Sequence, residues 1–192
     1  MSALVIFTET GFPHCGCVLD FDRDPQRWLG WQPDTSGRFS GRDLSEWTGG
    51  RVDPDTLDGV AGFMNYWGKL CEGFIDRRVR TDKINYYVRF TVEGDEVLHA
   101  AERKAIRDYV VKNDVYAFGN RDCVTFARDV AKYCGLETGM TAGVPDPDFY
   151  SPTPPSSELM DLLPYELLRK LYRLNPDRVD SHNWDAPGEL PG

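Results

Sequence analysis

A cysteine at the start of a predicted helix is the residue of this chain that is best suited to take part in a chemical reaction. After Cys123, small and apolar residues recur with the helical period of about 3.6. Asn120 and Asp122 are both suitable N-cap residues, and Gly135 suits the end of the helix. The exposed N–H groups and the dipole of a helix N-terminus favour a thiolate. The pattern therefore predicts a nucleophilic thiol, and the alternative interpretation is a small, buried core cysteine.

A nucleophilic thiol needs a base, and histidine suits this role because its pKa lies near neutrality. The chain has three histidines, His14, His99 and His182. His99 lies in a predicted amphipathic helix, and His182 lies in a polar C-terminal stretch. His14 opens a predicted strand directly after a Gly-Phe-Pro break, where a side chain can face a cleft at the end of a sheet. We therefore predict His14 as the base, against the alternative of a structural strand histidine.

The elements that must position these residues indicate an α+β fold. Alternating or continuous apolar residues predict strands at 4–8, 14–21, 27–31 and 84–92. A helical stripe spans 96–113, ahead of the Cys123 helix. Residues 34–58 are rich in Gly, Asp, Ser and Thr and are interpreted as a long loop. Residues 59–74 are interpreted as partly helical.

Composition shifts after Gly143, which suggests three parts. Residues 1–143 form the predicted catalytic domain, 144–156 a Pro-rich linker, and 157–192 a helical C-terminal extension and tail. Two short helices are expected at 157–163 and 164–174. Their leucines need a partner surface, either this domain or a second chain. Residues from Asn175 onward are expected to be weakly ordered.

Charge and hydropathy narrow the class of partner. The net charge of −9 disfavours nucleic acid and anionic membranes as partners. No apolar run approaches a transmembrane span, and the N-terminal run resembles a buried strand more than a Sec signal peptide. With five cysteines, an odd number, we expect reduced thiols in a cytoplasm. Secretion by a signal-independent route stays open.

A metal site is the first rival interpretation. His14, Cys15 and Cys17 offer three ligand groups within four residues. Zinc sites usually pair cysteines as Cys-x-x-Cys and need a second pair, which is missing here. On a strand, Cys15 and Cys17 also share a face that His14 does not. We therefore expect no metal and no cofactor.

Two segments resemble circularly permuted NlpC/P60-like, papain-fold cysteine hydrolases. The first is residues 11–20, Gly-Phe-Pro-His-Cys-Gly-Cys-Val-Leu-Asp, followed by Trp-Leu-Gly-Trp-Gln-Pro at 28–33. The second is residues 120–127, Asn-Arg-Asp-Cys-Val-Thr-Phe-Ala, similar to the family's Asn-Cys-x-x-Phe helix. The resemblance covers roughly residues 1–140 and has the permuted order, with histidine first. It implies an antiparallel sheet packed on the helix that bears Cys123 at its N-terminus, with Cys123 as nucleophile and His14 as base.

The chain departs from the family pattern at two positions. Pro13 replaces the glycine before the histidine, and Asp122 replaces the asparagine before the cysteine. A carboxylate at position 122 opposes a thiolate unless it caps the helix and points away.

The resemblance also guides the choice of the group that orients the imidazole. In the family this residue usually lies on the strand after the histidine, which favours Gln32. Glu9 could fold back toward the site. Asp20 shares the face of His14 but lies about 20 Å along the strand. We rank Gln32 first, then Glu9 and Asp20, and expect the Cys123 backbone N–H and one further donor to meet the oxyanion.

The resemblance implies amide hydrolysis through an acyl-enzyme, with a peptidoglycan stem peptide as the leading substrate. The alternatives are a lipid esterase or acyltransferase of the lecithin:retinol acyltransferase type, and a catalytically dead papain-like binding module. Signal-less bacterial proteins with such domains can be antibacterial effectors of a type VI secretion system. That origin would imply a cognate immunity protein as partner.

Overall fold

The computed structural model describes residues 1–9, 14–33, 71–79, 81–112, 115–116, 121–139 and 164–184. The loop predicted at 34–58, the linker at 144–156 and the helix at 157–163 lie outside the described residues. So do residues 59–70 of the segment interpreted as partly helical. The described residues form an α+β structure, which confirms the predicted class at this coarse level.

The strands form one antiparallel sheet in the order β6-β4-β3-β2-β1-β5-β7. Their bounds are Ala3–Glu9 (β1), Cys15–Asp20 (β2), Arg27–Pro33 (β3), Cys71–Asp76 (β4), Ile84–Thr91 (β5), Val115–Tyr116 (β6) and Val179–His182 (β7). The apolar β1 lies near the middle, with Leu4 and Ile6 fully buried. Central strands of this kind are buried on both faces, which explains the short continuous apolar run in the sequence.

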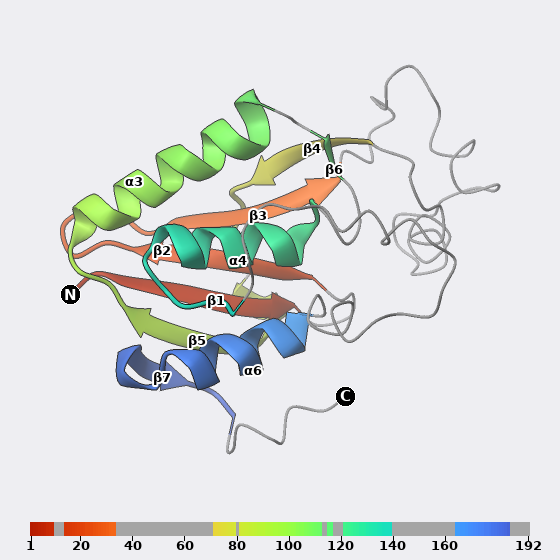
Figure 1. Cartoon of the computed structure of the whole chain (residues 1–192). Coiled ribbons are helices and arrows are strands. Elements are labelled where there is room, and N and C mark those ends of the chain that lie inside the picture. The colour runs from red at the N-terminus through yellow and green to blue at the C-terminus, as the bar shows by residue number, and fades with distance from the viewer. Residues whose placement is uncertain are drawn as a thin grey trace.

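Three helices lie over one face of this sheet (Figure 1). They are α3 (Asp95–Ala105), which continues into a π-helical turn η2 (Ile106–Val111), α4 (Cys123–Tyr133) and α6 (Pro164–Leu174); single turns of 3₁₀ helix occupy Thr81–Lys83 and Pro176–Arg178. Phe126 and Val130 of α4 and Leu168 of α6 are fully buried. The core therefore lies between this helical layer and the sheet.

The C-terminal segment belongs to the same core. Leu167, Leu168 and Leu171 of α6 are buried together with side chains of the central strands. The sequence left two partners open for the leucines of this segment, their own domain or a second chain. The structure shows that the leucines of α6 pack on their own domain. The expectation of weak order from Asn175 onward is wrong for residues 175–184, which the structure describes, because β7 pairs with β5 through Val88 and His182 and through Arg89 and Ser181. Residues 185–192 lie outside the described residues.

The partly helical interpretation is wrong for the residues that the structure describes at its end. Cys71–Asp76 is strand β4, which pairs with β3 from Gly30 to Pro33. Gly73 fits here because a Cβ atom would lie 2.1 Å from the Trp31 ring. Strand pairing with a distant partner thus overrides the weak local pattern.

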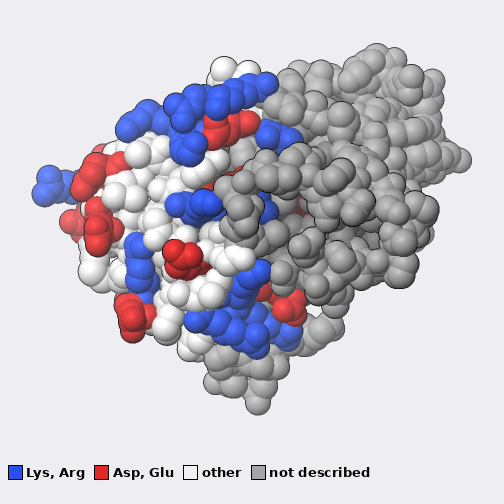
Figure 2. All heavy atoms as spheres, in the orientation of Figure 1, with Lys and Arg blue, Asp and Glu red and all other residues white. Residues whose placement is uncertain are grey.

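The helix-covered face carries charges of both signs. Figure 2 shows Lys and Arg side chains over the regions of α3 and α6, with Asp and Glu between them.

Candidate active site

Cys123 is the first residue of α4, as predicted. Asp122 is the N-cap, and its carboxylate accepts a hydrogen bond of 2.9 Å from the Thr125 N–H. The Phe126 N–H donates to the Asp122 carbonyl over 3.0 Å, which closes the first helical turn. Of the two predicted cap residues, the structure shows Asp122, and Asn120 lies outside the described residues. Cys123 is buried, with 4% of its surface exposed.

The thiol lies where the pairing between β2 and β3 has ended. This pairing joins Cys17 to Leu29 and Leu19 to Arg27. The Glu9 N–H donates to the His14 carbonyl over 3.0 Å, so the next amide along β2, that of Cys15, faces away from β1 and toward β3. The Cys15 N–H donates to the Cys123 sulfur. The Cys123 sulfur thus lies beside the backbone of Cys15, the residue that follows His14.

Burial is the main influence on the pKa of the Cys123 thiol, and the neighbouring charge of Asp122 adds to it. Together they raise that pKa to about 12, although hydrogen bonds from the Cys15 amide and the Tyr116 side chain act in the opposite direction. Asp122 caps the helix, but its negative charge still disfavours the Cys123 thiolate. In this conformation the thiol is neutral at pH 7, and an acceptor for its proton is needed before it can attack.

The His14 and Gln32 side chains meet at this end of the sheet, where β2 begins and β3 ends. The His14 Nε2 and the Gln32 Nε2 are 3.1 Å apart, and His14 is 6% exposed. Gly30, between them, has no side chain, and a Cβ atom there would lie 3.3 Å from the His14 Nε2. Half a turn of the Gln32 amide exchanges its nitrogen for its oxygen. The oxygen can accept from Nε2–H, which leaves the His14 Nδ1 as the basic nitrogen.

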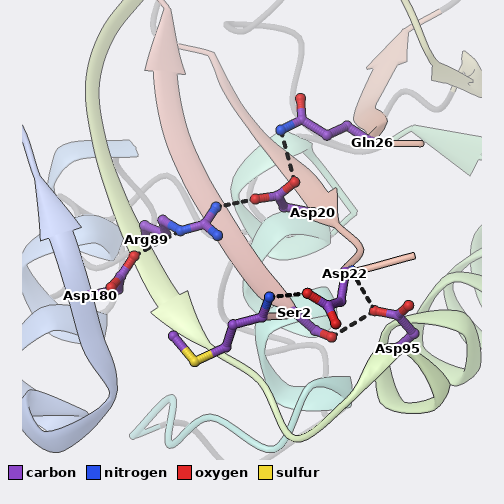
Figure 3. Close-up of polar contacts among 8 residues, drawn as sticks. Ser2, Asp20, Asp22, Gln26, Arg89, Asp95 and Asp180 are labelled. Atoms are coloured by element: carbon purple, nitrogen blue, oxygen red, sulfur yellow. Dashed lines mark hydrogen bonds and ion pairs between the residues drawn. The ribbon is translucent and has the colours of Figure 1, made fainter. Parts of the chain in front are cut away.

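The other candidates for the third residue lie differently. Glu9 is buried at the end of β1. Burial is the main cause of the raised pKa of Cys15, and the charge of Glu9 adds to it, which places Glu9 near Cys15. Asp20 lies at the far end of β2 from His14. It accepts from Gln26 over 2.8 Å and forms an ion pair with Arg89 (Figure 3). The structure thus brings Gln32 and Glu9 to the site and engages Asp20 elsewhere.

The remaining histidines have other surroundings. The His99 Nε2 lies 3.0 Å from a carboxylate oxygen of Asp24. His182 is the last residue of β7, and the centre of its ring lies 4.9 Å from that of the Trp184 ring. Neither histidine contacts the segment around Cys123 in any of the interactions that the structure records for the described residues.

Tyr116 is a site residue that sequence reasoning missed. Its hydroxyl group donates to the Cys123 sulfur and accepts from the Cys123 backbone N–H. Burial is the main reason why its own pKa lies well above the usual value. Tyr116 belongs to the two-residue strand β6, which pairs with Cys71 of β4. No local pattern in the sequence marks so short a strand.

Within the described residues, no group of three or more His, Cys, Asp or Glu side chains could hold a metal ion. The same part of the chain contains no helix of sufficient length and apolar character to cross a membrane. Comparisons of the chain with protein-family models, with curated proteins and with solved structures give no match.

Proposed function

We propose that this chain is a papain-like thiol hydrolase. Cys123 is the nucleophile, His14 the general base and Gln32 the residue that orients the imidazole. The sulfur attacks an amide carbonyl while its proton moves to His14. The leaving amine takes that proton, and water then hydrolyses the thioester on Cys123 with His14 again as base. By resemblance, the amide belongs to a peptidoglycan stem peptide.

One observation carries this proposal. The Cys123 sulfur accepts a hydrogen bond from the Cys15 amide. Cys15 directly follows His14, whose ring is within hydrogen-bond distance of the Gln32 side chain. The proposal thus groups the Cys123 thiol, the His14 imidazole and the Gln32 amide at one end of the sheet. A nucleophile, its base and an orienting group are the parts that acyl transfer requires.

The oxyanion would be met by the donors beside the sulfur. The Cys123 N–H is one donor, and the Tyr116 hydroxyl group, which now accepts from that N–H, is the second. As the carbonyl oxygen enters, the hydroxyl turns its proton toward it. Two donors aimed at the developing negative charge stabilise the transition state by several kcal/mol. Removal of one such donor typically costs about 3 kcal/mol.

A non-catalytic binding module is the second candidate, and a specific observation favours it. Cys123 is buried, and its pKa of about 12 leaves almost no thiolate at pH 7. A dead site would keep this buried thiol as a core residue. The two candidates differ in whether His14 can accept the proton when a substrate arrives.

Hydrolysis by the purified chain separates these candidates. Peptidoglycan sacculi and phospholipid vesicles are incubated with the wild type and with the variants Cys123→Ala and His14→Ala. We expect new amino and carboxyl termini from sacculi, with both variants inactive. Fatty-acid release from vesicles would support the lipid esterase instead. If the wild type and both variants leave both substrates intact, the binding module stands.

Expression in a bacterial host tests the proposed setting. We expect lysis when the chain carries a periplasmic signal and none without it, as a wall hydrolase delivered by a type VI secretion system requires. Cys123→Ala should abolish the lysis. Toxicity without the signal would contradict a wall substrate and indicate a cytoplasmic or lipid target. A co-expressed immunity protein should protect the host.

A further inference from the structure

Trp31 links the two halves of the proposed site. It is fully buried on β3, directly before Gln32. Its indole Nε1–H donates to the Arg121 carbonyl over 2.8 Å. Arg121 lies two residues before Cys123 in the segment that leads into α4. A single hydrogen bond therefore joins the strand that holds the imidazole's partner to the backbone that carries the thiol.

The Arg121 side chain also makes specific contacts. Its guanidinium lies over the Tyr109 ring, 4.4 Å from the ring centre, and its Nη2 donates to the Asp108 carbonyl over 2.7 Å. The Tyr109 ring meets the Trp31 ring edge-on at 5.2 Å. It meets the Phe126 ring edge-on at 4.9 Å. The three rings and the half-buried guanidinium thus form one cluster that joins β3, η2, α4 and the residue ahead of its N-cap.

The π-helical turn explains how Asp108 can accept this bond. In an α-helix, the Lys112 N–H would donate to the Asp108 carbonyl. In η2 it donates to the Arg107 carbonyl instead, over 2.9 Å. The Asp108 carbonyl can therefore turn to Arg121. A π-turn weakens a helix locally and often marks a functional region. Here it supplies the acceptor that fixes the segment before Cys123.

We propose that Trp31 is a positioning residue that sets the separation between the Cys123 thiol and the His14 imidazole. This inference rests on the proposed function. Proton transfer from sulfur to imidazole needs the two groups at hydrogen-bond distance, and a displacement of about 1 Å can cost about a hundredfold in rate. The Trp31–Arg121 bond ties β3, whose Gln32 side chain contacts the His14 imidazole, to the segment that leads into Cys123.

The variant Trp31→Phe tests the inference because it keeps an aromatic ring and removes the N–H donor. The matched control is Tyr133→Phe, which removes a hydrogen bond of 3.0 Å to Asp108 between α4 and η2, at the opposite end of α4 from Cys123. Thermal unfolding of both full-length variants measures the loss of stability. Alkylation of Cys123 by iodoacetamide, followed by mass spectrometry from pH 5 to 10, measures the coupling to His14.

We expect Trp31→Phe to raise the apparent pKa of Cys123 alkylation by about one unit or more. This slows the reaction at pH 7 by about threefold for each unit, because the loss of thiolate is partly offset by its greater nucleophilicity. Adding His14→Ala to Trp31→Phe should change little further. Tyr133→Phe should keep the wild-type profile. If Trp31→Phe does not fold, Arg121→Met removes the bond to the Asp108 carbonyl and should shift the profile in the same direction.

Two failures are distinguishable. If His14→Ala slows the wild-type reaction but the folded Trp31→Phe or Arg121→Met variant keeps the wild-type profile, the positioning role is wrong and the proposed function stands. The same conclusion follows if Tyr133→Phe shifts the profile as much as Trp31→Phe. If His14→Ala has no effect in the wild type, both proposals are wrong.

Discussion

The carboxylate beside the nucleophile gives the sharpest electrostatic prediction. Asp122 is 1% exposed, and its charge is the second cause, after burial, of the raised pKa of Cys123. Asp122→Asn removes that charge. It keeps a side-chain oxygen for the Thr125 N–H, and asparagine is as good an N-cap as aspartate. The variant therefore separates the charge of this residue from its capping role.

The expected size follows from Coulomb's law. Two like charges about 5 Å apart interact by about 3 kcal/mol at an effective dielectric constant of about 20. This corresponds to a fall of about two units in the pKa of Cys123. Each unit gives about ten times more thiolate at pH 7, but the weaker base is also a weaker nucleophile. Alkylation of Cys123 should therefore become about tenfold faster at pH 7.

Site-resolved alkylation by iodoacetamide between pH 6 and 9 measures this change, and thermal unfolding checks that the helix cap survives. Asp122→Ala is the matched variant. It removes the charge and the cap together, so it should also react faster but lose about 1 kcal/mol of stability. If Asp122→Asn alkylates at the wild-type rate and unfolds at the wild-type temperature, the electrostatic reasoning about this site is wrong.

Three further predictions concern the imidazole and the fold. Gln32→Ala should lower kcat by about tenfold or more by freeing the imidazole. Glu9→Gln should have a smaller effect, and the reverse order in kinetic assays would make Glu9 the third residue. Gly30→Ala should lower activity while the chain stays folded by circular dichroism, because its Cβ would lie 3.3 Å from the His14 Nε2; wild-type activity would show that the ring can shift freely. Burial alone would raise the pKa of Asp108, but hydrogen bonds from Lys112, Lys104 and Tyr133 together outweigh it and hold that pKa below its usual value. Asp108→Asn should therefore cost about 2 kcal/mol near pH 7. This loss should shrink as the pH falls below about 4, since the charged form stabilises the fold only above that range; a loss that is constant with pH in denaturant titrations would contradict it.

The parts of the fold that were predictable are those with a local pattern. The apolar run of β1 and the alternation of β2 and β5 mark strands, and the period after Cys123 marks α4. The strand β4 was missed because its pairing with β3 is decided by a partner distant in the sequence. The strand β7 was missed because four largely polar residues at a sheet edge carry no periodic signal.

The candidate site shows the same division. Cys123 and its cap could be found because helix starts have a chemical signature, and Gln32 because of the resemblance. Tyr116 could not be found, since its role depends on how β6 pairs with β4. The hydrogen bond from Trp31 to Arg121 could not be predicted either, because a side chain that donates to a carbonyl distant in the sequence produces no characteristic residue spacing.

The central claim is that His14 activates Cys123, and Cys134 offers an internal reference for testing it. Burial raises the pKa of Cys134 to about 12, the same value as for Cys123. Site-resolved alkylation of both thiols near pH 7 is compared in the wild type and in His14→Ala. We predict that Cys123 reacts at least about tenfold faster than Cys134 in the wild type, and that His14→Ala removes this difference. Equal rates for the two thiols in the wild type, or a difference that persists without His14, would contradict the account.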